Sequence, residues 1–175
     1  MKKLRDTLER GLQLQEVNVT LDPDTADPYC LKISKDRKRI TGFKGFFGKR
    51  AVLGWQMFSS GRHFWDVIVD RTGEWSVGVT SEPENLKDVH AKTRKWRIRE
   101  WEGKYTAISP SKRFDLVLSE RPKRIRISLN CEGGQVSFFD ARTAALLHTF
   151  SDASLVGETL LPYFYLHEGG CMTLP

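Results

Sequence analysis

From about residue 17 onward, apolar and polar residues alternate along the chain with a period of two. In VNVTLD, residues 17–22, an apolar side chain occupies every second position, and RIRISLN, residues 124–130, repeats the pattern with isoleucine and leucine against arginine and serine. HFWDVIVD, residues 63–70, follows it as well, with His63, Trp65, Val67 and Val69 on one face. A period of two is the signature of a β-strand buried on one side. We therefore predict that these segments are strands with their apolar faces turned inward.

Turn signals separate these runs at short and regular intervals. They include DPDTADP, SSGRH, DRTGEW, EWEGKY, SERPKR and NCEGGQ. No helical pattern lies between them, and many short strands at this spacing indicate an antiparallel sandwich or barrel. With 175 residues, the chain fits one all-β domain, which we place at residues 17–175.

Residues 1–16 follow a different pattern. Leu4, Leu8 and Leu12 lie at i, i+4 and i+8 with charged residues between them, which predicts a short amphipathic helix that Gly11 weakens. Such a helix either packs on the domain or forms the end of a coiled coil, in which case the parent protein would be dimeric through that coiled coil.

The segment KWRIREW, residues 95–101, combines aromatic, basic and acidic residues. In an extended chain its side chains fall on two faces: Trp96, Ile98 and Glu100 on one, and Arg97, Arg99 and Trp101 on the other. We expect the first face to pack inward. The second places two guanidinium groups beside an indole, a mixture suited to recognition of a ligand.

The composition is that of an ordinary soluble globular domain, with 39% hydrophobic and 29% charged residues. No stretch approaches the roughly 20 apolar residues that cross a bilayer, so we expect no direct membrane insertion. The net charge of +6 permits nucleic acids, phosphorylated ligands or acidic proteins as partners without choosing among them.

The residues that catalysis or metal binding would need are scattered. The four histidines lie on different predicted elements without HExxH spacing, and the three cysteines form no CxxC pair and carry no local protease signature. We therefore predict no catalytic residues, no metal and no cofactor. The cysteines are expected to be free thiols in a reducing compartment.

Four stretches, in order along the chain, resemble the PRY-SPRY domain of tripartite-motif proteins and butyrophilins. They are VTLDPDTADP, VLGWQMFSSGRHFWDVIV followed by EWSVGV, ISLNCEGGQVSFFDA, and LPYFYL before the final proline. The resemblance covers nearly the whole chain, from Val17 to Pro175. It departs from the family pattern at Asp66, at Asn130 and Cys131, and in several loops. It implies a β-sandwich of two sheets that binds ligands and has no catalytic activity of its own.

The resemblance also implies a shallow ligand surface at one end of the sandwich. By motif, Ser76 would lie in this pocket, Arg99 and Trp101 correspond to contact positions of known members, and His167 and Glu168 would form a wall. The loop GFKGFFGKR adds Phe46 and Phe47 beside Lys44 and Arg50, a plausible contact cluster or a cover for the sheet edge.

Three ligand classes fit these residues. A protein ligand, bound through Arg97, Arg99 and Trp101, is the first. The second is a phosphorylated small molecule in a basic pocket built from Arg50, Arg62, Lys92, Arg94, Arg97 and Arg99. The third and most distant is RNA, stacked on Trp101 and Tyr105, for which the chain has no signature motif.

We therefore expect a protein-binding domain that selects substrates for a cytoplasmic tripartite-motif E3 ubiquitin ligase. The alternative is a cytoplasmic butyrophilin-type sensor of a phosphorylated small molecule.

Overall fold

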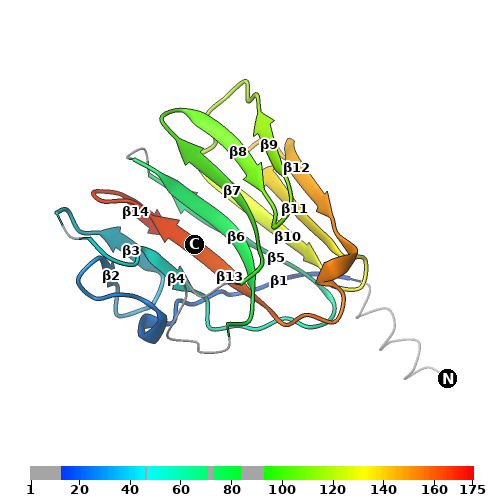
Figure 1. The fold of residues 1–175 in the computed structure, drawn as a ribbon, viewed down its shortest axis with the longest axis horizontal. Helices are drawn as coiled ribbons and strands as arrows, with labels where there is room; N and C mark the ends of the chain where they lie inside the picture. The colour runs from blue at the N-terminus through cyan, green and yellow to red at the C-terminus, as the bar shows by residue number, and fades with distance from the viewer. Residues whose placement is uncertain (1–12, 46, 71–72, 84–92) are drawn as a thin grey trace.

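A computed structural model describes residues 13–45, 47–70, 73–83 and 93–175 of the chain. These residues form two β-sheets packed face to face, with two short 3-10 helices (Figure 1). The elements are β1 (Leu14–Glu16), η1 (Pro23–Thr25), β2 (Leu31–Ile33), β3 (Arg39–Gly42), β4 (Ala51–Leu53), β5 (Arg62–Val69), β6 (Trp75–Ser81), β7 (Lys95–Trp101), β8 (Lys104–Ile108), β9 (Arg113–Leu116), β10 (Arg124–Asn130), β11 (Gln135–Asp140), β12 (Leu146–Ser151), η2 (Ala153–Leu155), β13 (Leu160–Leu166) and β14 (Cys171–Thr173). The predicted all-β sandwich is confirmed.

The two sheets have different sizes. The eight-stranded sheet has the order β12-β11-β10-β5-β14-β3-β2, with β1 added beside β5, and the six-stranded sheet has the order β4-β13-β6-β7-β8-β9. Every pairing between these strands is antiparallel except the parallel one between β1 and β5. Strands distant in sequence, such as β6 and β13, thereby become neighbours.

The hydrophobic core lies between the sheets, where the predicted alternation places it. Ile125, Ile127 and Leu129 of β10 are fully buried, and the indoles of Trp65, Trp75 and Trp96 are no more than 2% exposed. Burying one large apolar side chain contributes about 1.5–3 kcal/mol, so these inner faces supply most of the stabilisation of the sandwich.

Two predicted turns are confirmed in detail. Asp22 accepts a hydrogen bond from the backbone of Asp24 (3.1 Å), and Asp27 accepts one from Tyr29 (2.9 Å), so both carboxylates of DPDTADP close local turns. The glycine-rich NCEGGQ segment joins β10 to β11, with Gly134 at a φ of 63°.

The predicted N-terminal helix is wrong at its end. Leu14–Glu16 form strand β1, because their backbone pairs with Arg62–Phe64 of β5 instead of continuing a helical turn. Residues 1–12, which hold the rest of the predicted helix, lie outside the described residues. None of the helices in the described ranges has the length and apolar character needed to span a bilayer.

Candidate functional site

Strand β7 has the two faces that its sequence predicts. Trp96 and Ile98 are fully buried and Glu100 is nearly so, whereas Arg97 and Arg99 are partly exposed and Trp101 is 42% exposed. Glu100 is satisfied inside the sandwich, where it accepts hydrogen bonds from Nε1 of Trp75 (2.7 Å) and Nε of Arg121 (2.9 Å). The outer face of the six-stranded sheet therefore carries the two arginines and the exposed indole.

Arg97 lies over a floor of polar and aromatic groups. Its Nη1 donates to Oγ of Ser76 (3.2 Å), and that hydroxyl donates to the carbonyl of Ile98 (3.1 Å). Burial lowers the pKa of Arg97, although a guanidinium stays charged at every physiological pH. Burial also raises the pKa of the neighbouring Tyr163 to about 12. Arg97 is thus a poorly hydrated cation that a ligand could neutralise.

Arg99 is held between an acid and an aromatic ring. Its Nε lies 2.6 Å from Oε1 of Glu74, and its guanidinium lies 5.3 Å from the ring centroid of Trp101. The Trp101 ring in turn meets His167 edge to face, with centroids 6.4 Å apart. Arg99, Trp101 and His167 therefore form one continuous surface.

The turn that carries His167 docks against strand β3. A Cβ atom at Gly42 would lie only 2.4 Å from the carbonyl oxygen of His167, so this close approach requires glycine. Beside it, Glu168 accepts a hydrogen bond from the backbone of Gly45 (2.9 Å). This hydrogen bond, with the nearby charges of His167, Arg50 and Lys44, lowers the pKa of Glu168. The predicted wall at His167 and Glu168 therefore lies next to the loop that contains Lys44.

A small hollow of about 260 Å³ opens at this end of the sheet. Its lining includes Glu74, Trp101, Arg121 and His167. The ring atom Nδ1 of His167 is buried and has no hydrogen-bond partner within the described residues. A buried, unsatisfied polar atom costs free energy, so a ligand that reached it would gain from pairing with it.

Three predicted contact residues are not available on this surface. Ser76 is fully buried beneath Arg97, and Arg50 is buried with its guanidinium on the carbonyl of Phe43 (2.9 Å). Tyr105 pairs with Glu100 in the sheet register, so its side chain points into the core and cannot stack a base beside Trp101. Arg50 and Tyr105 are buried inside the domain, whereas Ser76 faces the outer side of the sheet and is covered by Arg97.

The other residues of the predicted loop cluster differ in position. Phe47 and Lys44 are exposed, whereas Phe46 lies outside the described residues. Phe47 remains a candidate contact.

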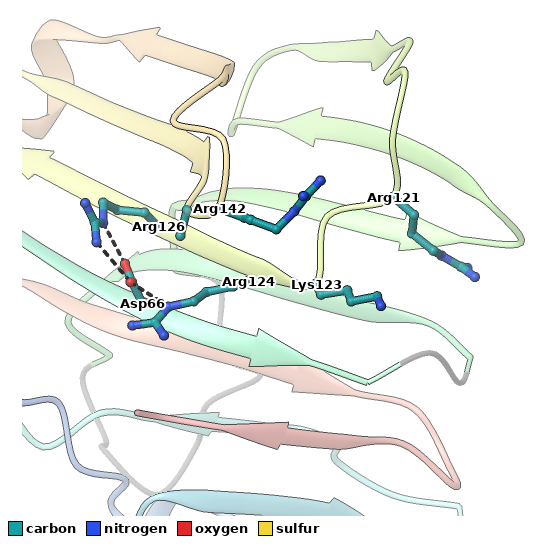
Figure 2. Close-up of a pocket in the computed structure, with 7 residues that line it drawn as sticks. Asp66, Arg121, Lys123, Arg124, Arg126 and Arg142 are labelled. Atoms are coloured by element: carbon teal, nitrogen blue, oxygen red, sulfur yellow. Dashed lines mark hydrogen bonds and ion pairs between the residues drawn. The ribbon is translucent and has the colours of Figure 1, made fainter.

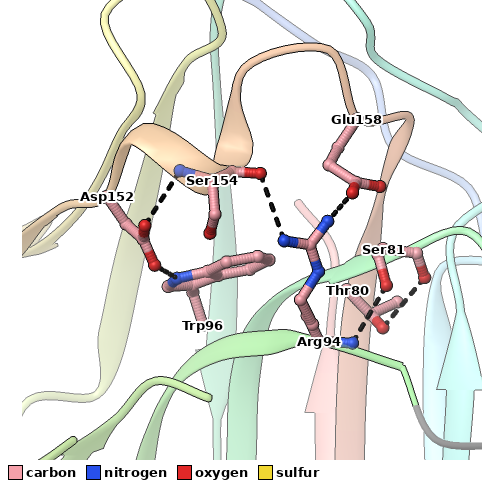
Figure 3. A network of polar contacts seen from close by, with 7 residues as sticks. All are labelled: Thr80, Ser81, Arg94, Trp96, Asp152, Ser154 and Glu158. Atoms are coloured by element: carbon pink, nitrogen blue, oxygen red, sulfur yellow. Dashed lines mark hydrogen bonds and ion pairs between the residues drawn. The ribbon is translucent and has the colours of Figure 1, made fainter. Parts of the chain in front are cut away.

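The six basic residues of the alternative phosphate pocket are not gathered in one place. Arg94 forms an ion pair with Glu158 and donates to the carbonyl of Ser154 (3.4 Å), at the other end of β7 (Figure 3). Arg62 belongs to β5 in the opposite sheet, and Lys92 lies outside the described residues. Among the described members of this set, only Arg97 and Arg99 share a face.

Sequence reasoning missed three residues of the site: Glu74, Tyr163 and Tyr165. The tyrosines belong to the motif LPYFYL, whose alternation as a strand would have placed both rings on one face. Register then brings Tyr163 opposite Gly78 and Tyr165 opposite Ser76, next to the arginines of β7. No sequence pattern identified Glu74 as a site residue, because its partner Arg99 lies 25 residues away in strand β7.

The site contains no cluster for metal chemistry. Across the described part of the chain, no group of three or more His, Cys, Asp and Glu side chains could hold a metal ion. His63 is hydrogen-bonded to the carbonyl of Ser60 (2.7 Å) and packs on Phe58, which makes it a structural residue.

Comparison with known proteins identifies the family. The SPRY domain model matches residues 62–175. Butyrophilin subfamily 1 member A1 of Homo sapiens is 32% identical over 169 residues, which cover 90% of this chain and 32% of that protein. The E3 ubiquitin-protein ligase TRIM58 of Mus musculus is 32% identical over 181 residues, covering 91% of this chain and 35% of that protein. The chain thus spans about a third of the length of these relatives.

The fold has solved counterparts. The crystal structure of the TRIM65 PSpry domain superimposes with a TM-score of 0.76 at 20% identity, covering 98% of this chain and 95% of that one. Together with the family match and the two-sheet architecture, this likeness establishes the conclusion that the sequence motifs predicted: the chain belongs to the SPRY domain family, with butyrophilins and TRIM proteins among its relatives.

Proposed function

We propose that this domain recognises a partner protein through the outer face of the six-stranded sheet, with Arg97, Arg99, Trp101 and His167 as its contact residues. The observation that carries the proposal is the exposed indole of Trp101 between Arg99 and His167. Tryptophan and arginine are the residues most enriched among those that dominate protein–protein binding energy.

Contacts within the domain hold the two arginines of the site in place. Glu74 and the Trp101 ring hold Arg99, and Ser76 holds Arg97, so little side-chain entropy remains to be lost on binding. A partner carboxylate or carbonyl facing Arg97 would replace the hydration that burial has removed.

The larger role that we propose follows from the relatives. A domain of this kind, joined to a ubiquitin-ligase module elsewhere in a cytoplasmic parent protein, would choose the substrate by binding it. This role assigns no catalytic residue to the domain itself. A coiled coil preceding the domain would make the parent dimeric and double the number of recognition surfaces.

The test compares two tryptophans with similar exposure. Trp101 is 42% exposed and Trp55 is 60% exposed, but Trp55 belongs to neither the hollow nor β7. Proteins captured from cell lysate by the wild-type domain would be compared with those captured by Trp101→Ala and Trp55→Ala. The captured partner would then be purified and titrated by calorimetry.

We expect Trp101→Ala to weaken binding of the purified partner by about 2 kcal/mol, which is about thirtyfold, and Trp55→Ala to leave it unchanged. A partner that binds the Trp101 variant as tightly as the wild type would place the recognition surface elsewhere.

A phosphorylated small molecule is the second candidate, favoured by the two neighbouring guanidinium groups of Arg97 and Arg99. It ranks second because Arg50, Arg62 and Arg94 are placed elsewhere. Calorimetric titration with inorganic pyrophosphate decides the matter: saturable heat that disappears in Arg99→Ala would support this candidate, and absence of heat would contradict it.

A further inference from the structure

A second cationic surface lies on the outer face of the eight-stranded sheet and shares one lining residue, Arg121, with the hollow of the candidate site. It is a hollow of about 570 Å³ over β5 and β10 (Figure 2). Its lining consists of Asp66, Arg121, Lys123, Arg124, Arg126, Ala141 and Arg142. Five of these seven residues are cationic and one is acidic.

Asp66 orders the centre of this hollow. It accepts hydrogen bonds from Nε of Arg124 (2.8 Å) and from Nε and Nη2 of Arg126 (2.8 and 3.1 Å). Burial alone would raise the pKa of Asp66, but the two arginines outweigh it, so the pKa lies below its usual value. Both arginine side chains nonetheless stay about 40% exposed (43% and 40%). They are fixed in position and still reachable by a ligand.

The hollow keeps an excess of positive charge. Arg121 is engaged by Glu100, and Arg142 forms an ion pair with Glu120. Lys123 is exposed, and it takes part in none of the ion pairs found among the described residues. Outside those two ion pairs, the lining carries three positive charges, on Lys123, Arg124 and Arg126, against the one carboxylate of Asp66, and Glu16 of β1 also attracts Arg126.

A second hollow, of about 370 Å³, continues the surface across the sheet through the shared residue Lys123. Strand register places a row of outward residues there: Arg39 of β3, Thr173 of β14, Ile68 of β5 and Arg124 of β10. Three strand spacings separate the two arginines, or about 14 Å, and Ile68 between them is 38% exposed. We call this the Arg39–Arg124 row.

We propose that the Arg39–Arg124 row and the adjoining hollow bind an extended acidic segment of a partner protein. An extended peptide advances about 3.3 Å per residue, so the row corresponds to about four such steps, that is, to a segment of about five residues. Because alternate side chains of an extended chain share a face, the matching pattern is acidic residue, spacer, apolar residue, spacer, acidic residue. The acidic residues would meet the two arginines, and the apolar residue would cover Ile68.

Nucleic acid fits this surface less well. The residues that line the two described hollows include no aromatic side chain on which a base could stack. Asp66 and Asp70 also lie in the linings, where they would repel a continuous phosphate backbone. A peptide can carry carboxylates only at the positions that face the arginines, whereas a nucleic acid carries a phosphate on every nucleotide.

The inference does not rest on the proposed function: the row lies on the eight-stranded sheet, and Arg121, the residue that lines both this hollow and the hollow of the candidate site, is left unchanged in the test. The test is fluorescence polarisation of the 175-residue chain with a short labelled peptide, in which two aspartates flank a central leucine with one glycine or serine spacer on each side. The variant is Arg39→Glu combined with Lys123→Glu, since both residues are exposed and neither is bound to Asp66. The matched control is Lys104→Glu combined with Lys112→Glu, the same charge change at exposed positions of β8 and the β8–β9 turn in the six-stranded sheet.

We expect saturable binding that the first variant weakens at least about tenfold and that the control variant and Arg99→Ala leave unchanged. Replacing both aspartates of the peptide by asparagine should abolish binding, and replacing the leucine by alanine should weaken it. Absence of saturable binding to the wild type would overturn the proposal. So would an equal loss in the control variant, or an oligouridine probe that binds more tightly than the peptide and depends on the same residues.

Discussion

The two outer faces of the sandwich both carry arginines, but they hold them in different ways. On the eight-stranded sheet, Asp66 is hydrogen-bonded to Arg124 and Arg126, which remain well exposed. On the six-stranded sheet, Arg97 rests on a serine hydroxyl among tyrosines, and burial lowers its pKa. The first arrangement stabilises the fold and presents two ordered cations to a ligand. In the second, burial removes water from a cation, which raises the free energy of its charged form.

This difference shows that arginines on a protein surface can serve either stability or ligand binding, depending on the groups beside them. A carboxylate partner makes an arginine part of the framework, and removing that partner harms stability. A desolvated arginine that relies on a hydroxyl contributes little to stability, and a ligand that supplies negative charge gains from it. The two faces can therefore be told apart by their response to substitution.

The largest expected effect is at the acids. Asp66→Asn should lower the free energy of unfolding by about 2 kcal/mol, because it leaves two arginines without their shared carboxylate. The loss is not larger because both arginines are partly exposed, so water can solvate them. Glu74→Gln should cost less, about 0.5–1 kcal/mol, because it releases only Arg99. Urea denaturation of both variants measures the difference. Equal losses would mean that the two faces depend on their acids to the same degree.

A smaller effect, of opposite sign on the two faces, is expected from removing an arginine. Arg126→Met should destabilise the domain by about 1 kcal/mol, since it breaks two hydrogen bonds to Asp66 and the contact with the Phe64 ring. Arg97→Met should be neutral or stabilising by up to about 1 kcal/mol, because an apolar chain replaces a desolvated charge. Thermal and urea unfolding of the pair would test this, and a clear loss of stability in Arg97→Met would contradict it.

The smallest effect concerns the side of the sandwich where β9 and β12 meet. His148 packs against Phe114 and Phe150, its Nε2 has no hydrogen-bond partner among the residues described, and burial lowers its pKa. Because the unfolded chain takes up this proton first, stability should fall as pH drops below about 6.5, with a slope that is only a fraction of the limiting value of about 1.4 kcal/mol per pH unit for one proton.

The corresponding variant is His148→Phe, which cannot titrate. Its free energy of unfolding should change less between pH 7.5 and 5.5 than that of the wild type, as measured by urea denaturation at each pH. The same slope in both proteins would show that His148 keeps its solution behaviour.

Sequence alone predicted the features that depend on local patterning. One-sided burial leaves a period of two, so the inward faces of β7 and β10 follow directly from the alternation of their residues. The partners of charged residues do not, because they depend on strand order: Asp66 meets Arg126 across 60 residues and Glu100 meets Arg121 across 21. For the same reason, the sequence could not distinguish Arg50, which is buried with its guanidinium on a backbone carbonyl, from Arg97, which is partly exposed on the outer face of the sheet.

The position of β14 determines when the eight-stranded sheet can be completed during synthesis. This strand lies in the interior of the sheet, between β5 and β3, so it connects the β2–β3 hairpin to the other strands of the sheet. A ribosome must therefore translate and release residues 171–173 before these pairings can form, and until then the edges of β3 and β5 are open to other chains. A premature stop codon only a few residues upstream of Cys171 would leave β3 and the Ile68–Val69 end of β5 without the strand that pairs with both, which makes such a product a target for aggregation and for cellular quality control.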